Sequence, residues 1–280
     1  MVVFSFLASC KRGDSEEPGT PQPVAAVVAS APAQTWRNLM KGVDFGRFPV
    51  PGGGDKELRI VRIDVKIAPL KSLSCSNLGH GSLVADQWAA KHKLSIVINA
   101  GMFETDNVSH IGFWKSDGDL LRAETRKDYF SFAAFGARDA TVPAFHIFDS
   151  DAAEIDKEVL PLYQDVIQNL RLVKRPAENR WKQQDKAWSE AALGEDDAGR
   201  ALLIFCPVGL TMHDLNEHLL KLPIHLVAAQ HLEGGPEASL YVKVGDFEIR
   251  GIGSYETGFN ENDDNHQFWP IPNVIGVSSP

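Results

Sequence analysis

Alternating and continuous apolar stretches along the chain predict a series of β-strands. Residues 57–67 (ELRIVRIDVKI) alternate apolar and charged positions, as a half-buried strand does. Short apolar runs without alternation indicate strands that are buried on both faces, and they occupy residues 94–98, 201–206 and 224–229. A further strand is predicted over residues 142–148. Two Gly–Asp turns, at residues 117–119 and 245–246, each predict a β-hairpin.

Two segments carry the pattern of an amphipathic helix. Residues 82–92 predict one such helix just before the buried run that follows them. Residues 211–222 predict the other, because Thr211 and Asp214 form a capping box at its start. The apolar positions that follow this box fall on one face of the helix.

The remaining segments decide the expected fold class. Residues 154–170 have a helical composition, and Pro161 within them predicts a kink or a restart. The polar tract 174–197 is predicted to be irregular. Predicted strands outnumber predicted helices, and the two types do not alternate strictly along the chain. We therefore expect an α+β fold, a single domain with a mixed, mainly antiparallel sheet and packed helices.

The first 41 residues differ in character from the rest. A short apolar stretch leads into Leu-Ala-Ser-Cys10, which fits the box at which bacterial lipoproteins are cleaved and lipidated on the cysteine. This predicts a signal segment over residues 1–10, although the positive region of a signal peptide is not present. A random apolar start with a stray cysteine is the alternative. Residues 11–41, rich in Pro, Ala and Ser, predict a disordered tether, and residues 42–280 the folded domain.

Location and charge limit the partners that we expect. The lipoprotein pattern predicts a protein of the bacterial cell envelope, on the periplasmic or outer face, that contacts the membrane only through its N-terminal lipid. A net charge of −9 and a pI near 5.5 argue against a nucleic-acid partner or an anionic membrane surface. Any phosphate recognition has to come from a local arginine cluster. The sequence predicts no particular oligomeric state.

The predicted domain holds two cysteines, Cys75 and Cys206. Cys206 ends an apolar run and is predicted to be a small buried hydrophobic side chain rather than a reactive thiol. A disulfide between the two would fit an oxidising compartment, and their positions leave its geometry open. No Cys/His spacing of the kind that binds zinc occurs, and no cofactor is implied.

Two polar strand ends are the candidate functional segments. Glu233 follows the buried run 224–229 and directly precedes Gly234 and Gly235, where backbone can approach a ligand closely. Asn99 ends the run 94–98 in a similar way, and a glycine follows it two residues later. Loops held by a rigid sheet often carry binding and catalytic groups. A tight turn with a solvated glutamate and a turn-forming asparagine are the alternative interpretations.

Together the two segments resemble the phosphodiester glycosidase domain family. The family pattern has an Asn-Gly-Gly-hydrophobic-Phe strand end and, later, a Leu-Asp-Gly-Gly turn followed by a serine. Here residues 99–103 (NAGMF) and 232–235 (LEGG) are similar to these motifs, with Ser239 a few residues further on. The resemblance runs from about residue 42 to residue 276.

The resemblance implies hydrolysis of a sugar phosphodiester at the anomeric carbon, with a glycan or sugar-phosphate substrate. This chemistry needs a carboxylate near the anomeric carbon and a cation for the phosphate. Glu233 is the candidate base or nucleophile, and Asn99 would orient a sugar hydroxyl or the attacking water. The amides of Gly234 and Gly235 could bind a phosphate oxygen. The other substrate-binding candidates are Gly101, His110, Glu237 and Ser239.

The arginines that would hold the phosphate are harder to assign. Arg62 resembles a family strand position, and Arg171 is a second candidate, with a solvated surface role as the alternative for both. Family members commonly carry an arginine just before an Ala-hydrophobic-Gly strand. The matching stretch here is residues 188–194 (WSEAALG), with Glu190 at that position. Phosphate binding would then be lost, or would move to Arg171, Arg180 or Arg200.

Two other functions remain open at the level of sequence. A non-catalytic glycan-binding domain on the same fold would agree with the missing arginine. A metal-dependent hydrolase could use His231 and Glu233, because residues two apart on an extended backbone share a face. Two candidate ligands fall short of a metal site, however, so no metal is assigned.

Overall fold

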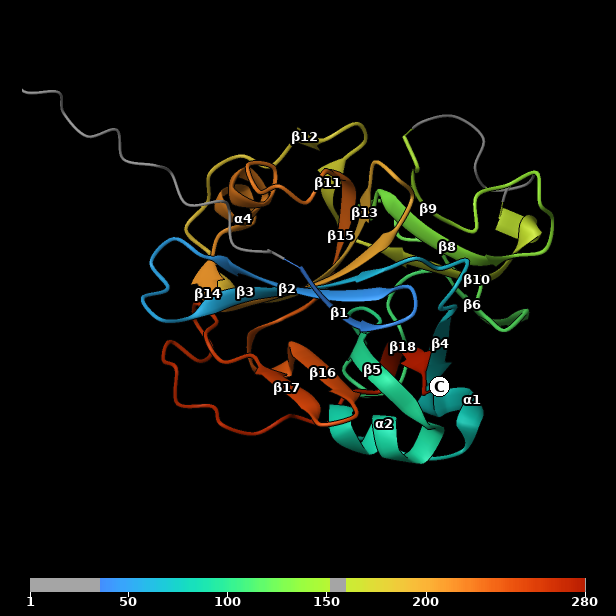
Figure 1. Cartoon of the computed structure of the whole chain (residues 1–280), viewed down its shortest axis with the longest axis horizontal. Coiled ribbons are helices and arrows are strands. Elements are labelled where there is room, and N and C mark those ends of the chain that lie inside the picture. The colour runs from blue at the N-terminus through green and yellow to red at the C-terminus, as the bar shows by residue number, and fades with distance from the viewer. Residues whose placement is uncertain (1–35, 152–159, 280) are drawn as a thin grey trace, which may run out of the picture. The chain divides into compact units, whose positions relative to one another are not determined.

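The computed structural model describes residues 36–151 and 160–279. Within these residues the chain forms three β-sheets, and their strand pairings are all antiparallel (Figure 1). The predicted signal segment, the predicted lipidation site Cys10 and most of the predicted tether lie outside the described residues. The first strand starts at Trp36, inside the segment 11–41 that was expected to be a tether.

The largest sheet has eight strands and supplies most of the residues discussed below. In spatial order its strands are β1 Trp36–Met40, β2 Val43–Pro49, β3 Glu57–Ile63, β14 Ala201–Leu210, β13 Trp188–Asp196, β15 Leu226–Gly234, β11 Arg171–Lys174 and β12 Glu178–Asn179. β13 is central, with β14 on one side and β15 on the other. Its residues are therefore buried along almost their whole length.

Two five-stranded sheets complete the β-structure. The second sheet has the order β7 Asp119–Arg122, β6 Trp114–Ser116, β10 Tyr163–Asn169, β8 Ser131–Ala137 and β9 Phe145–Asp149. The third has the order β17 Phe247–Ile252, β16 Ser239–Val244, β5 Leu94–Asn99, β18 Asn273–Ser278 and β4 Leu70–Ser74.

The helices of the described residues are short. They are α1 Cys75–Leu78, α2 Ala85–His92 and α4 Met212–Leu219, with 3₁₀ turns η1 Leu160–Leu162 and η2 Gly235–Glu237. α2 packs on β5, and α4 lies beside β11 and β12 (Figure 1). None of these helices is long and apolar enough to span a membrane.

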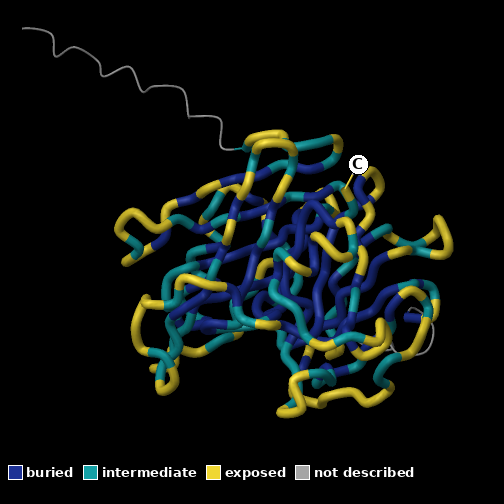
Figure 2. The backbone as a smooth tube through the Cα atoms, turned by 90° about the horizontal axis from the view of Figure 1, so that it is seen from below, coloured by how far each residue is buried: buried dark blue, intermediate teal, exposed yellow. Residues whose placement is uncertain are grey.

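One apolar core joins the three sheets. It includes Phe205 of β14, Phe135 of β8 and Ile98 of β5, one from each sheet, and all three are fully buried. Figure 2 shows buried residues, coloured dark blue, gathered in the interior of the backbone. A second cluster packs α4 against the large sheet and includes Leu215 and Cys206. Apolar burial of this kind contributes about 25 cal/mol per Å².

The expected α+β class is wrong, because the described chain is dominated by β-structure. Residues 163–169 of the predicted 154–170 helix form β10, which lies between β6 and β8; residues 152–159 lie outside the described part. The tract 174–197, predicted to be irregular, contains the nine-residue strand β13. Both strands are buried on both faces, so neither shows the alternation by which a half-buried strand is recognised.

Local turn and cap signals are confirmed. Asp117 and Gly118 both have positive φ, at 48° and 88°, in the turn between β6 and β7. The second predicted hairpin is formed by β16 and β17. The side chain of Thr211 accepts a hydrogen bond from the Asp214 backbone N–H at 3.0 Å and caps α4.

Both cysteines of the domain are free and buried. The side chain of Cys206 is fully buried on β14, as predicted for a small hydrophobe. Burial raises the pKa of its thiol to about 12, so the thiol stays protonated at neutral pH.

Candidate functional site

A pocket of about 380 Å³ lies where β13 and β15 meet, and Glu233 lines it. Glu190 of β13 pairs with Gly234 of β15, and a register shift follows one residue later on β13. The acidic and basic groups of the wall are His231, Glu233, Glu237 and Glu256. The apolar wall is formed by Met102, Phe103, Ile111, Leu170, Trp188 and Met212.

His231, which lines this pocket, forms a buried pair with Glu190. The Glu190 Oε1 and His231 Nδ1 atoms are 2.7 Å apart, and both side chains are at least 96% buried. The other oxygen, Oε2, accepts a hydrogen bond from the indole Nε1–H of Trp188 at 2.7 Å. A buried charge needs such partners, because desolvation otherwise costs several kcal/mol.

The two members of this pair shift each other's pKa in opposite directions. Burial by itself would lower the pKa of His231, but the Glu190 carboxylate beside it raises the pKa above the ordinary value. Burial raises the pKa of Glu190, and His231 offsets part of that rise. The second ring nitrogen, Nε2, makes no hydrogen bond to any described residue, and His231 lines the pocket.

Glu233 is a carboxyl group that keeps its proton at neutral pH. Burial raises its pKa to about 8, and the negative charge of Glu237 adds to the rise. His231 and the Gly234 N–H, which donates to Glu233 Oε1 at 3.1 Å, offset only part of it. The sequence suggested a base or nucleophile here, whereas this environment suits a proton donor.

The two glycines after Glu233 make room for neighbouring side chains. A Cβ at Gly234 would lie 2.5 Å from the indole ring of Trp188, and one at Gly235 would lie 2.5 Å from Oε2 of Glu256. Gly235 also has a φ of 62°, which favours glycine. The glycines thus allow Trp188 and Glu256 to approach the turn. The Gly234 amide is already occupied by the Glu233 carboxyl group.

Asn99 and Ser239 hold the turn that carries Glu237. Asn99 Nδ2 donates to the backbone oxygen of Glu237 at 3.0 Å, and Asn99 Oδ1 accepts from the Ser239 N–H at 2.7 Å. Ser239 Oγ also donates to the Glu237 oxygen at 3.0 Å. Both groups of the Asn99 amide are used in this way, so Asn99 ties β5 to the Glu237 turn and does not itself line the pocket. Burial raises the pKa of Glu237.

His110 and Gly101 form a tight contact behind the apolar wall. His110 Nε2 bonds to the Gln168 backbone oxygen at 2.9 Å, and burial lowers the pKa of this imidazole to about 4. It is therefore neutral at pH 7 and buried away from the pocket. Gly101 has a φ of 148°, and a Cβ there would lie 2.2 Å from Asn169 Oδ1 and 2.5 Å from His110 Cε1.

We expect Gly101→Ala to lower the free energy of unfolding by about 1–3 kcal/mol, the usual cost of overpacking. The added methyl group would push against Asn169 and His110, and neither can move without losing a buried hydrogen bond. Urea denaturation measures the change. Gly81→Ala is the matched control, because a Cβ at Gly81 meets nothing within 4 Å. Equal stability of the two variants would contradict the tight contact.

The arginines proposed for phosphate binding are engaged elsewhere. Arg62 forms an ion pair with Asp44 at 2.8 Å. Arg171 forms ion pairs at 3.1 and 2.9 Å with Asp149 and Asp151. The remaining two are paired in the same way, Arg180 with Glu178 and Arg200 with Asp196. Among the described residues, those that line the Glu233 pocket include no arginine or lysine.

Among the pocket residues that sequence analysis did not single out are two with polar groups, Trp188 and Glu256. Trp188 stood in the tract predicted to be irregular, and Glu256 in a tail rich in Asn, Asp and Pro. An isolated β-bridge between them brings both to the pocket. The position of Trp188, two residues before Glu190, could have indicated that it lies near the site. No feature of the sequence around Glu256 indicated this. No group of three or more side chains that could hold a metal is found among the described residues.

Comparisons with known proteins relate this geometry to a family. The family model described as phosphodiester glycosidase matches residues 92–278, which include every residue of the pocket. The fold is similar to the zebrafish N-acetylglucosamine-1-phosphodiester alpha-N-acetylglucosaminidase catalytic domain, auto-inhibited by its pro-peptide. The TM-score is 0.61 at 15% identity, covering 89% of this chain and 85% of that one.

Two further solved structures share the fold. One is a hypothetical protein from Synechocystis, with a TM-score of 0.58 and 15% identity, covering 89% of this chain and 64% of that one. The other is a putative exported protein from Burkholderia pseudomallei, with a TM-score of 0.51 and 10% identity, covering 80% and 74%. No curated protein matches this chain.

Proposed function

Because this chain belongs to the phosphodiester glycosidase family, we propose that it hydrolyses the bond at the anomeric carbon of a sugar, in a glycosyl phosphodiester or a related glycan. The observation that carries the proposal is the carboxyl group of Glu233, held protonated in a pocket that two further carboxyl groups line. Carboxyl groups with different proton affinities in one pocket are the usual arrangement for acid and base roles in glycoside cleavage.

In the proposed reaction Glu233 donates its proton to the oxygen that leaves the anomeric carbon. A second carboxylate then activates the attacking water. Glu256 suits this role, because its carboxylate lines the pocket and makes no hydrogen bond to a described residue. The oxocarbenium-like transition state is positive, so the surrounding carboxylates stabilise it. The flat faces of Trp188 and Phe103 would pack against the sugar ring.

The charged groups of the pocket predict which leaving group the protein prefers. Glu190 stands where the family pattern has an arginine, and no arginine or lysine among the described residues lines the pocket to hold a phosphate. We therefore expect a glycoside with an uncharged leaving group to be hydrolysed with a higher kcat/KM than the phosphodiester of the same sugar. Matched pairs of such substrates test this with the whole chain. A phosphodiester preference would contradict the expected leaving group.

A glycan-binding protein without catalysis is the second candidate function, and Glu190 in place of an arginine favours it. The same substrate panel separates the two. Saccharide binding without release of product from any member of the panel would contradict hydrolysis and support binding alone. Binding is measured by calorimetry on the same preparation, so that an inactive sample is recognised.

Activity is expected to fall as the pH rises through about 8, by tenfold per unit once Glu233 has lost its proton. Activity falls with rising pH because a proton donor must be protonated to act. The raised pKa of Glu233 keeps it protonated through neutral pH. The measurement is kcat against pH with an unactivated leaving group. A nitrophenyl leaving group needs little protonation, so with this substrate kcat should fall much less at alkaline pH. An identical limb with both leaving groups would contradict the donor role.

A further inference from the structure

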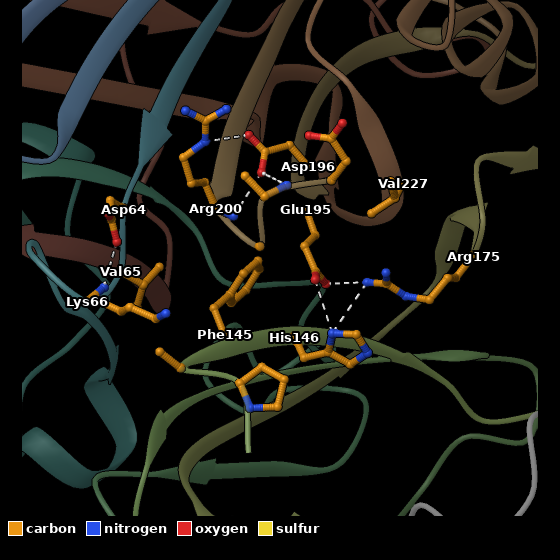
Figure 3. A pocket seen from close by; sticks show the side chains of 15 residues that line it. Asp64, Val65, Lys66, Phe145, His146, Arg175, Glu195, Asp196, Arg200 and Val227 are labelled. Atoms are coloured by element: carbon orange, nitrogen blue, oxygen red, sulfur yellow. Dashed lines mark hydrogen bonds and ion pairs between the residues drawn. The ribbon is translucent and has the colours of Figure 1, made fainter. Parts of the chain in front are cut away.

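Figure 3 shows a second and larger pocket, whose volume is about 700 Å³. It lies at the opposite end of β13 from Glu190. Glu195 and Asp196, at the end of β13, line it together with His146 of β9. Successive strand residues are about 3.3 Å apart, so Glu195 lies roughly 17 Å along the strand from Glu190. This pocket is therefore separate from the one that holds Glu233.

The two buried carboxylates of this pocket each accept three hydrogen bonds from protein donors. Glu195, with a side chain 5% exposed, accepts hydrogen bonds from His146 Nδ1 at 3.0 Å and from the Ile147 N–H at 2.7 Å, and it forms an ion pair with Arg175. Asp196 accepts from Arg200 Nε at 2.7 Å and also from two backbone N–H groups. Through these bonds the two carboxylates fix the orientation of the basic side chains beside them.

The cations that they orient keep unused donors. Arg175 reaches Glu195 through Nη2 alone, and its buried Nε has no hydrogen-bond partner. Arg200 donates to Asp196 through Nε. Its two terminal nitrogens make no hydrogen bond to a described residue. Lys66 lines the same pocket and forms no ion pair with a described residue. Figure 3 shows Lys66, His146 and Arg175 around one cavity.

Two further carboxylates line the pocket, and their negative charge would repel an anion. Each of them, however, has a partner in the protein. Asp64 Oδ1 accepts a hydrogen bond from the Lys66 backbone N–H at 3.1 Å. Asp197 pairs with His225 at 3.5 Å, with more than half of each side chain exposed, so solvent screens it. The groups left to meet a ligand are therefore mainly donors.

We propose that this pocket binds a small anion, namely the carboxylate or phosphate group of a sugar or another small molecule. The guanidinium of Arg175, held by Glu195 through Nη2, has donors on Nη1 and Nε that no described residue uses, and a guanidinium binds both carboxylate and phosphate groups strongly. Lys66 supplies a second positive charge, and His146 stays bound to Glu195 through its Nδ1 at the wall of the pocket. The proposal is independent of the reaction at Glu233.

Calorimetry on the whole chain tests the proposal with inorganic phosphate, glucuronate and glucose as probes. We expect phosphate and glucuronate to bind and glucose not to bind, and the two anions separate a phosphate preference from a carboxylate preference. Affinity should fall as the salt concentration rises. Glucose binding as strong as glucuronate binding would overturn the proposal, and so would the failure of both anions to bind.

Two variants place the binding in this pocket. Lys66→Gln changes an exposed side chain without an ion pair to a described residue, so the fold should be kept while anion affinity falls tenfold or more. Arg175→Lys keeps a positive charge beside Glu195 but removes the planar guanidinium with its several donors. This variant should also weaken anion binding. Lys127→Gln, another exposed lysine, is the matched control. Unchanged affinity in Lys66→Gln would overturn the assignment.

Discussion

Glu233→Gln is expected to lower kcat by about 10³-fold, within the range of 10²–10⁴ for a lost proton donor. The amide has nearly the shape of the protonated carboxyl group, so the pocket should keep its structure. What is lost is the proton that Glu233 holds through its pKa of about 8. Steady-state kinetics on the better substrate of the panel measures the effect, and circular dichroism with urea denaturation checks the fold.

The matched control for this variant is Glu124→Gln, the same change on a side chain that is 75% exposed. Its kcat should equal that of the wild type. The alkaline fall in activity should also disappear from the residual rate of Glu233→Gln, because the titrating group has been removed. A Glu233→Gln enzyme with more than a tenth of the wild-type kcat would exclude Glu233 as the proton donor.

Glu190→Ala is expected to lower the free energy of unfolding by about 3–5 kcal/mol, the usual cost of removing one partner of a buried ion pair. His231 would be left buried with its Nδ1 unpaired, and the Trp188 indole N–H would lose its acceptor at 2.7 Å. Urea or guanidinium denaturation at neutral pH measures the loss.

Two comparisons show that the loss comes from the buried pair. Glu190→Gln keeps an acceptor for Trp188 and should cost less than Glu190→Ala. Glu57→Ala breaks an ion pair with Arg47 whose side chains are 42% and 47% exposed, and such pairs contribute only about 0–1 kcal/mol. If Glu190→Ala were no more destabilising than Glu57→Ala, the Glu190–His231 pair would not stabilise the fold.

The elements that the sequence predicted well are those with a local cause. The hairpin at Asp117 and Gly118 follows from two residues that accept positive φ, and the start of α4 follows from the cap on Thr211. The failures are β10 and β13. Their side chains are buried on both faces by neighbouring strands, so the choice between helix and strand depended on neighbours that no local pattern shows.

The two motifs come together at one pocket, and the roles assigned to their residues stay predictions. Glu233 and Glu237 line one pocket, and Asn99 bonds to the Glu237 turn, so the two motifs do meet. Asn99 uses its whole amide to hold that turn. Arg62 and Arg171 lie in ion pairs away from the pocket, although both had been candidates for it. An arginine is assigned to a site only by its partners, which sequence spacing does not reveal.

The sequence by itself determined the family, through the strand end at Asn99 and the Glu233-Gly234-Gly235 turn, and it placed a carboxylate at position 190. The tertiary structure alone decided that Glu190 pairs with His231, that Trp188 and Glu256 join the pocket, and that Glu233 keeps its proton. Motifs depend on neighbours in the chain and can be read along it. Proton affinity depends on burial and on charges contributed by distant strands, and these exist only once the sheets have packed.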